Sequence, residues 1–254
     1  MTYQIEPIGI IRSPYSEKFA VPRQPNLVSA GQGELYLLAP YNDPISVKGL
    51  EQFSHLWLLF LFHHVAPEKW RLTVRPPRLG GNKTIGVFAT RSPFRPNHIG
   101  LSAVELKDII IENKQVVLKL GSLDLVDGTP IIDIKPYLPY SDSHSEALAG
   151  YAQSTPEKKI TVEFSQKARL SLDLQKQSYP QLAELITQVI SQDPRPAYKQ
   201  KNINEQAYGF TLYHFNIKWR IVNQHAIVED IYVGSLDSNM KCNFKHGGVK
   251  KVER

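Results

Sequence analysis

The residues best suited to chemistry lie in one proline-rich segment in the middle of the chain, Arg91 to Ser102. Each of its two prolines fixes its own φ and pushes the preceding residue towards an extended backbone, so the segment has little conformational freedom. A stiff loop can aim Arg91, Arg95 and Asn97 at a ligand without a large ordering cost on binding. Because guanidinium groups pair well with carboxylates and phosphates, the segment predicts an anionic ligand. A structural crossover with solvated arginines is the alternative.

Two carboxylates, Asp124 and Asp127, stand where an apolar run leads into the turn Gly128-Thr129-Pro130. Acidic side chains at such a position can receive a ribose diol or an ammonium group, as they do in nucleotide sites. An aspartate before a glycine is also ordinary turn chemistry, and this segment alone leaves both interpretations open.

Two adjacent histidines, His63 and His64, raise the question of a metal site shared with Asp124 and Asp127. Neighbouring side chains on a strand point to opposite faces, so the histidines are not expected to share one ion. The helical i, i+4 spacing and the thiolates that often support zinc are also missing. We therefore expect no metal, and histidines that are hydrogen-bonded or line a pocket.

An arginine between prolines occurs twice more, at Pro22-Arg23-Gln24-Pro25 and between Asp193 and Tyr198. The basic segment Arg75 to Lys83 suits either phosphate contact or a solvated loop. Gly31-Gln32-Gly33 lacks the third glycine of a dinucleotide fingerprint, and neither a P-loop nor a nucleophile elbow is present. Any cofactor must therefore bind outside the common α/β plan.

The composition of the chain indicates what kind of partner it binds and in which cellular compartment it works. The chain has 254 residues, with 30 Lys and Arg against 24 Asp and Glu and a formal net charge of +6, which suits an anionic partner such as RNA. One cysteine, Cys242, excludes an intrachain disulfide and a cysteine-rich zinc site and favours a reducing compartment. The segment Met1 to Ile11 does not resemble a signal peptide, and the apolar run Leu56 to Phe62 is far shorter than a membrane span. We expect a soluble, cytoplasmic protein.

Strands must position these segments in the first part of the chain. Short β-branched and aromatic runs alternate there with Gly, Pro and Asn and show no helical periodicity. Many short strands without intervening helices indicate an antiparallel barrel or sandwich. The expected strands are Ile5–Arg12, Gly33–Leu38, Leu56–His64, Leu72–Arg75, Ile85–Ala89, Ala103–Ile111, Gln115–Leu120 and Pro130–Ile134.

The chain changes character after Tyr140, where a stretch rich in Ser, Ala and Gly indicates a linker up to Pro156. Apolar residues at i, i+3, i+4, i+7 and i+8 then predict a helix from Leu182 to Ile190, which the prolines after Asp193 end. The remaining expected strands are Phe210–Ile221 and Ala226–Val233. We expect one domain at residues 1–142, a second at residues 157–235 and a basic tail at residues 236–254.

The run Arg91 to Ser102 closely resembles the signature loop of the TrmO family of tRNA methyltransferases. His98 replaces the proline usual in that family, which removes one stiffening element and places a titratable group beside Asn97. The neighbouring signature residues are kept, so we expect activity to be retained. The resemblance also covers Ile11–Tyr15, Phe19–Pro25, Phe53–Trp57, Val74–Gly81, Gly121–Pro130, Asp133–Tyr137 and Asp193–Tyr198, which together reach about residue 220.

The resemblance implies a mainly β protein, with a single-sheeted antiparallel β-barrel as the N-terminal domain and a smaller α+β C-terminal domain that helps to hold tRNA. It also implies S-adenosylmethionine as the cofactor and a homodimer with the cofactor site near the subunit interface. By position, the implied cofactor contacts are Pro22, Arg23, Gln24, His63, His64, Arg91, Leu101, Asp124, Leu125, Val126 and Asp127. The residues implied for catalysis and substrate binding are Arg95, Asn97, Asp193, Arg195 and Tyr198.

The implied reaction is methyl transfer to the exocyclic N6 amine of threonylcarbamoyl-adenosine, at the position 3′ of the anticodon of a threonine tRNA. Such a displacement depends largely on positioning, together with an acceptor for the amine proton, for which Asp193, Asp124 and Tyr137 are candidates. Arg95 and Arg195 are candidates for binding the threonylcarbamoyl carboxylate. The alternatives are a non-enzymatic RNA-binding or regulatory protein and a metal-dependent phosphodiesterase.

Overall fold

The computed structural model describes residues 3–156, 160–195 and 206–234. The first part of the chain contains the strands β1 (Gly9–Arg12), β2 (Gln32–Leu37), β3 (His55–Leu61), β6 (Ile99–Glu112), β7 (Gln115–Ser122) and β8 (Pro130–Pro136). They form a closed barrel in the order β1-β2-β7-β6-β3-β8, and every neighbouring pair is antiparallel. This confirms the mainly β fold, and of the barrel and the sandwich that the strand pattern left open, it is the antiparallel barrel implied by the family resemblance.

Alternation of side chains explains why these segments close into a barrel. Along β3, Leu56, Leu58 and Phe60 are buried, whereas the residues between them are only partly buried. Along β6, Ser102 is buried and Leu101 is half exposed. Because successive side chains of a strand point to opposite faces, each strand sends one set of residues into the barrel and the other outward.

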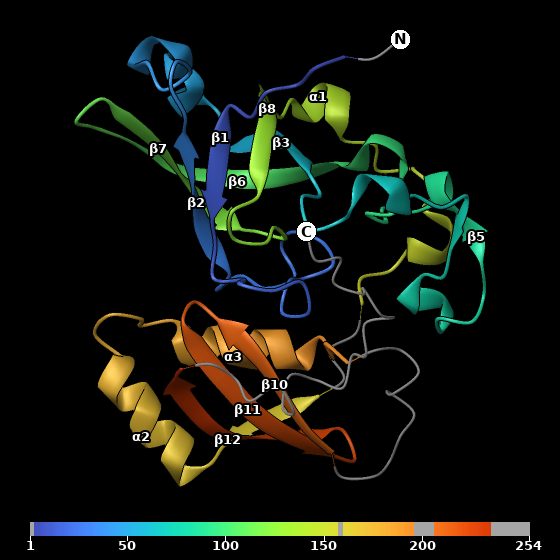
Figure 1. Cartoon of the computed structure of the whole chain (residues 1–254), viewed down its shortest axis with the longest axis vertical. Coiled ribbons are helices and arrows are strands. Elements are labelled where there is room, and N and C mark those ends of the chain that lie inside the picture. Colours follow the sequence, from blue (N-terminus) through green and yellow to red (C-terminus); the bar gives the residue numbers. More distant parts are fainter. Residues whose placement is uncertain (1–2, 157–159, 196–205, 235–254) are drawn as a thin grey trace, which may run out of the picture.

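Short elements connect the barrel strands and follow the last of them, β8. They comprise the two-stranded sheet β4 (Thr73–Val74) and β5 (Ile85–Gly86), the short helix α1 (Pro139–Asp142) and the 3-10 helices Pro44–Val47, Leu50–Gln52, Pro67–Lys69, Pro77–Leu79, Val87–Ala89, Pro96–His98 and Gly150–Ala152. The expected strand Ile85–Ala89 therefore ends early and continues as a 3-10 helix. Figure 1 shows β5 on an arm beside the barrel.

The last part of the chain is a smaller α+β unit. It contains β9 (Thr161–Phe164), α2 (Gln166–Gln175), α3 (Leu182–Ser191), β10 (Gln206–Leu212), β11 (Phe215–Val222) and β12 (His225–Val233), with the sheet order β10-β11-β12-β9. The predicted helix is confirmed as α3, but β9 and α2 were not expected. The single strand expected over Phe210–Ile221 is in fact the hairpin of β10 and β11. The tail at 236–254 lies outside the described residues.

The loop between β1 and β2 joins the two parts. Tyr15, Ala20, Val28 and Ala30 belong to the same buried apolar cluster as the residues of α3 and of the sheet β10-β11-β12. The isolated bridge between Tyr15 and Leu212 adds backbone pairing to this packing. Figure 1 shows the loop between the barrel and the C-terminal sheet. The segment that carries Pro22, Arg23 and Gln24 is thus held by both parts. Within the described ranges, no helix is long and apolar enough to cross a membrane.

Candidate active site

Three predicted site residues from distant segments meet beside the barrel. Arg91 donates a hydrogen bond from Nη1 to Oε1 of Gln24, which lies in the β1–β2 loop. The positive charge of Arg91 also acts on Asp124, which follows β7, and favours its ionised form. An amide, a guanidinium and a carboxylate together can receive both the charged and the neutral polar groups of a ligand.

Asp124 is the most perturbed carboxylate of this group. Ser102 donates from Oγ to Oδ1 of Asp124 at 2.7 Å. Burial raises the pKa of Asp124 to about 6, although the bond from Ser102 and the charge of Arg91 oppose this shift. A carboxylate with this pKa is mostly ionised at pH 7 yet poorly hydrated, which favours a hydroxyl or ammonium donor as its partner.

A second group lies where the β1–β2 loop approaches the end of α3. Desolvation lowers the pKa of Arg23, the carboxylate of Asp193 opposes this shift, and the charge of Arg78 adds to it. Asp193 accepts from Nε of Arg195 at 2.7 Å and from Nη2 at 2.8 Å, and both residues are buried. Burial opposes the charge of Arg195, but Asp193 raises its pKa above the ordinary value. Tyr198 lies outside the described residues.

The ion pair between Asp193 and Arg195 limits two expected roles, substrate binding by Arg195 and proton acceptance by Asp193. Two nitrogens of Arg195 are held by Asp193, so this side of the guanidinium is not presented to a substrate carboxylate. Both carboxylate oxygens of Asp193 accept from Arg195, which makes Asp193 a weaker candidate for accepting a proton. The substrate role of Arg195 stays a prediction.

Hydrogen bonds as well as prolines stiffen the loop that carries Arg95 and Asn97. Arg95 donates from Nη1 to the carbonyl of Thr90 at 3.0 Å, and the hydroxyl of Thr90 accepts from the amide of Ser92 at 3.2 Å. Asn97 and His98 both have left-handed backbones, with φ of 63° and 53°. A proline, whose φ stays near −65°, cannot adopt the conformation found at His98. The loop therefore turns here in a way that its prolines did not reveal.

The two histidines lie close together just beyond β3. Our expectation that they point to opposite faces of a strand is wrong, because β3 ends at Leu61 and the ring centroids of His63 and His64 are 4.1 Å apart. Burial and the neighbouring ring of His64 lower the pKa of His63, which favours a neutral imidazole. Among the described residues, no group of three or more His, Cys, Asp and Glu side chains could hold a metal ion.

Leu101 points away from the Asp124 group. Its neighbour Ser102 is buried and bonded to Asp124, whereas Leu101 is 50% exposed on the outer face of β6. Leu59 pairs with Leu101 across β3 and β6, and Trp57 lies two residues before Leu59 on the same outward face. The outer face of β3 and β6 is therefore apolar around Trp57, Leu59 and Leu101.

Two family matches cover most of the chain. The tRNA-methyltransferase O N-terminal domain matches residues 10–143, and the TrmO C-terminal domain matches residues 157–234. The chain belongs to the tRNA-methyltransferase O (TrmO) family.

Individual relatives agree with this assignment. The chain is 55% identical over 222 residues to the tRNA (adenine(37)-N6)-methyltransferase of Escherichia coli, covering 87% of this chain and 94% of that protein. It is 49% identical over 220 residues to a Pseudomonas aeruginosa protein named putative S-adenosylmethionine-dependent methyltransferase RcsF, covering 86% of this chain and 93% of that protein. The crystal structure of TrmO from Pseudomonas aeruginosa superposes with a TM-score of 0.75 at 40% identity, covering 91% of this chain and 99% of that one.

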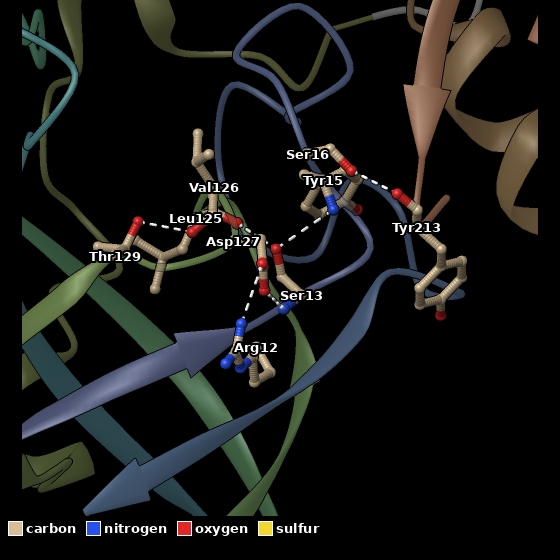
Figure 2. A network of polar contacts seen from close by, with 9 residues as sticks. All are labelled: Arg12, Ser13, Tyr15, Ser16, Leu125, Val126, Asp127, Thr129 and Tyr213. Carbon is tan, nitrogen blue, oxygen red and sulfur yellow. Dashed lines mark hydrogen bonds and ion pairs between the residues drawn. The ribbon is translucent and has the colours of Figure 1, made fainter. Parts of the chain in front are cut away.

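In this TrmO-family chain, hydrogen bonds hold the segment from Leu125 to Asp127 (Figure 2). Ser13 donates from Oγ to the carbonyl of Leu125 at 2.8 Å, and its amide donates to Oδ1 of Asp127 at 3.0 Å. Thr129 donates from Oγ1 to the carbonyl of Val126 at 2.6 Å. Part of the Asp127 carboxylate is thus engaged inside the protein, and its expected contact with the cofactor stays a prediction.

Three residues that the sequence analysis did not name as site residues bond to or act on the predicted ones: Ser13, Ser102 and Arg78. Serine is common and its hydroxyl gains a role only through its partners, so no sequence signal marked Ser13 or Ser102. Arg78 lies within the basic segment that we noted, but only the fold shows that its charge acts on Arg23. All three lie inside segments that resemble the family, but this position does not distinguish them from the polar residues beside them.

Proposed function

We propose that this chain transfers the methyl group of S-adenosylmethionine to N6 of threonylcarbamoyl-adenosine beside the anticodon of tRNA, with threonine tRNA as a substrate. Membership of the TrmO family makes the chain an S-adenosylmethionine-dependent tRNA adenine-N6-methyltransferase. The observation that carries the proposal is the meeting of Gln24, Arg91 and Asp124 beside the barrel.

The residues present fit the cofactor chemically. S-adenosylmethionine offers an ammonium group, a ribose diol, a carboxylate and an adenine edge. Asp124 supplies a poorly hydrated carboxylate for the ammonium group or the diol, and Arg91 supplies a guanidinium for the carboxylate. Gln24, which is already bonded to Arg91, adds an amide that can both donate and accept. When bound, the cofactor supplies an electrophilic methyl group on a sulfonium.

The protein's own contribution is positioning and recognition of charge. The stiff loop that carries Arg91 also holds the guanidinium of Arg95, which suits the carboxylate of the threonylcarbamoyl group or a phosphate of the tRNA. Both oxygens of Asp193 are held by Arg195, which weakens Asp193 as the proton acceptor and leaves Asp124 and Tyr137 as the other candidates. Arg23, which precedes Gln24 in the chain, and Arg78, whose charge acts on Arg23, add further positive charge.

We also propose a homodimer that forms through the apolar outer face of β3 and β6. Leu101 on this face is half exposed, and Trp70, Leu72 and Phe88 of the neighbouring arm are 48%, 75% and 77% exposed. Exposed apolar surface of this kind favours a partner, and a second copy is the commonest one. A dimer across this face would place Leu101 of each subunit at the interface. The tRNA substrate supports a cytoplasmic location.

The test uses nucleoside mass spectrometry of tRNA treated with the purified protein and S-adenosylmethionine. We expect one added methyl group on threonylcarbamoyl-adenosine and none on the same tRNA prepared without the threonylcarbamoyl group. Equal methylation of the two tRNAs would contradict the proposed substrate. A lack of transfer to either tRNA, in a preparation that binds S-adenosylmethionine, would contradict tRNA methylation itself.

A further inference from the structure

We propose that Ser13 is a positioning residue that fixes the shape of the segment from Asp124 to Asp127. This inference rests on the proposed function, because that segment carries four of the expected cofactor contacts. Ser13 lies just after β1, far from Asp124 in the sequence, and its side chain is partly buried. Its own side chain is not required to touch the cofactor.

Contacts on the barrel side tie Ser13 to this segment. Its hydroxyl donates to the carbonyl of Leu125 at 2.8 Å, and its amide donates to Oδ1 of Asp127 at 3.0 Å. The amide of Asp127 in turn donates to the carbonyl of Tyr15 at 2.8 Å. Three hydrogen bonds between two short stretches leave each little freedom relative to the other. Figure 2 shows the two stretches side by side.

Contacts on the other side tie the same stretch to the C-terminal unit. The amide of Tyr213 donates to the carbonyl of Pro14 at 2.7 Å, and the hydroxyl of Ser16 donates to the carbonyl of Tyr213 at 2.6 Å. The ring of Tyr15 is fully buried in the apolar cluster that contains α3 and the C-terminal sheet. Ser13 therefore stands on a stretch that is itself anchored, as Figure 2 shows.

Because Ser13 is anchored, its hydroxyl can hold the segment from Asp124 to Asp127 (the cofactor segment) in a fixed position. A hydrogen bond positions a group only as well as its donor is held, and the donor here is fixed by the C-terminal unit. Without the hydroxyl, the carbonyl of Leu125 loses its partner and the backbone beside Asp124 can relax. A small misplacement of binding groups is costly because ligand affinity depends on groups that are already in place.

The experiment compares Ser13→Ala with Ser16→Ala in the full-length protein. Each change removes one hydroxyl that donates to a backbone carbonyl, but only Ser13 faces the cofactor segment. Calorimetry with S-adenosylmethionine measures affinity, and thermal melting measures stability. We expect Ser13→Ala to weaken affinity about tenfold and Ser16→Ala to stay within about twofold. Ser13→Ala should also lower the melting temperature somewhat more than Ser16→Ala, because the hydroxyl of Ser13 additionally accepts from the amide of Tyr15 at 3.3 Å. Ser13→Thr, which keeps a hydroxyl, should restore affinity.

The outcomes separate this inference from the proposed function. Unchanged affinity in a folded Ser13→Ala protein would overturn the role of Ser13. Affinity that falls in both alanine variants in step with melting temperature would also overturn it, since the effect would then be general stability. If Ser13→Ala does not fold, weak affinity in a folded Ser13→Thr protein overturns the role. A parent protein that does not bind S-adenosylmethionine would instead overturn the proposed function.

Discussion

Replacing Asp124 with Asn is expected to stabilise the folded protein while weakening cofactor binding. Burial raises the pKa of Asp124 from 3.8 to about 6, even though Ser102 and Arg91 favour the ionised form. A raised pKa means that keeping this carboxylate ionised costs free energy of folding. The shift of about 2 units corresponds to at most about 3 kcal/mol, since one unit is about 1.4 kcal/mol. Asn keeps an oxygen that can accept from Ser102.

The pH dependence has a definite sign. Well below pH 3.8 the carboxyl of Asp124 is protonated in both the folded and the unfolded chain, so the stabilities of the parent and Asp124→Asn should converge as the pH falls towards this range. Between about pH 4 and 6 the folded chain binds more protons at this residue than the unfolded chain, and the parent loses stability relative to the variant as pH rises. Above about pH 6 the difference should stay at its maximum.

Urea denaturation at pH 4, 5, 6 and 7.5 measures this difference, and calorimetry with S-adenosylmethionine measures binding. Asp173→Asn serves as the control, because Asp173 is an exposed carboxylate on α2. We expect the control to match the parent in both assays and Asp124→Asn to bind the cofactor at least tenfold more weakly. A stability difference that is absent at pH 7.5, or equal at pH 4 and 7.5, would refute the reasoning about burial. Unchanged affinity would remove Asp124 from the cofactor site.

Three further predictions test the substrate contact, the dimer and the packing of the β1–β2 loop. Arg95→Lys should lower the rate of methyl transfer to tRNA about ten- to hundredfold in steady-state kinetics, because Lys lacks the planar guanidinium fork. Its affinity for the cofactor should change much less. Equal transfer rates in the variant and the parent would show that Arg95 does not contact the substrate. Leu101→Glu should shift a dimer to monomer in light scattering, and a persistent dimer would place the interface elsewhere. Gly31→Ala should destabilise the fold by about 1–3 kcal/mol, because overpacking carries a cost of this size and the new Cβ would lie 1.8 Å from Oη of Tyr15. Adding Tyr15→Phe, which removes a buried hydroxyl that has no hydrogen-bond partner among the described residues, should recover part of that loss in thermal melts. Equal melting temperatures for Gly31→Ala and the parent would contradict this packing argument.

Local signals in the sequence predicted the parts of the fold that depend on local physics. The helix α3 was recognisable because Leu185, Ile186 and Val189 form a continuous apolar face, and all three are buried. The helix α2 was missed because Ala168 is its one buried residue, so it has no such face. The strand β9 is short and pairs in parallel with β12, which is distant in the chain. Neither element carries a pattern that a short window can detect.

The candidate site divides in the same way. The stiff segment around Arg95 was predictable because a proline restricts its own neighbours whatever the rest of the chain does. The left-handed backbone of Asn97 and His98 was not predictable, since neither residue type requires it. The placement of His63 and His64 depended on where β3 ends, because the strand stops at Leu61, three residues before its expected end, and leaves both rings free to meet. The two hydrogen bonds from the guanidinium of Arg195 to the carboxylate of Asp193 could be seen only in the folded structure.

The sequence by itself determined the class of the molecule, a basic and strand-rich chain with arginines on proline-stiffened loops and no common nucleotide fingerprint. Periodicity, proline and glycine act over a few residues, so these properties can be recognised without the fold. Only the tertiary structure decided which polar groups meet. Arg91 and Gln24 are 67 residues apart, and Ser13 and Leu125 are 112 residues apart. Such contacts depend on the closure of the barrel and on the docking of the β1–β2 loop against the C-terminal unit, which no local pattern encodes.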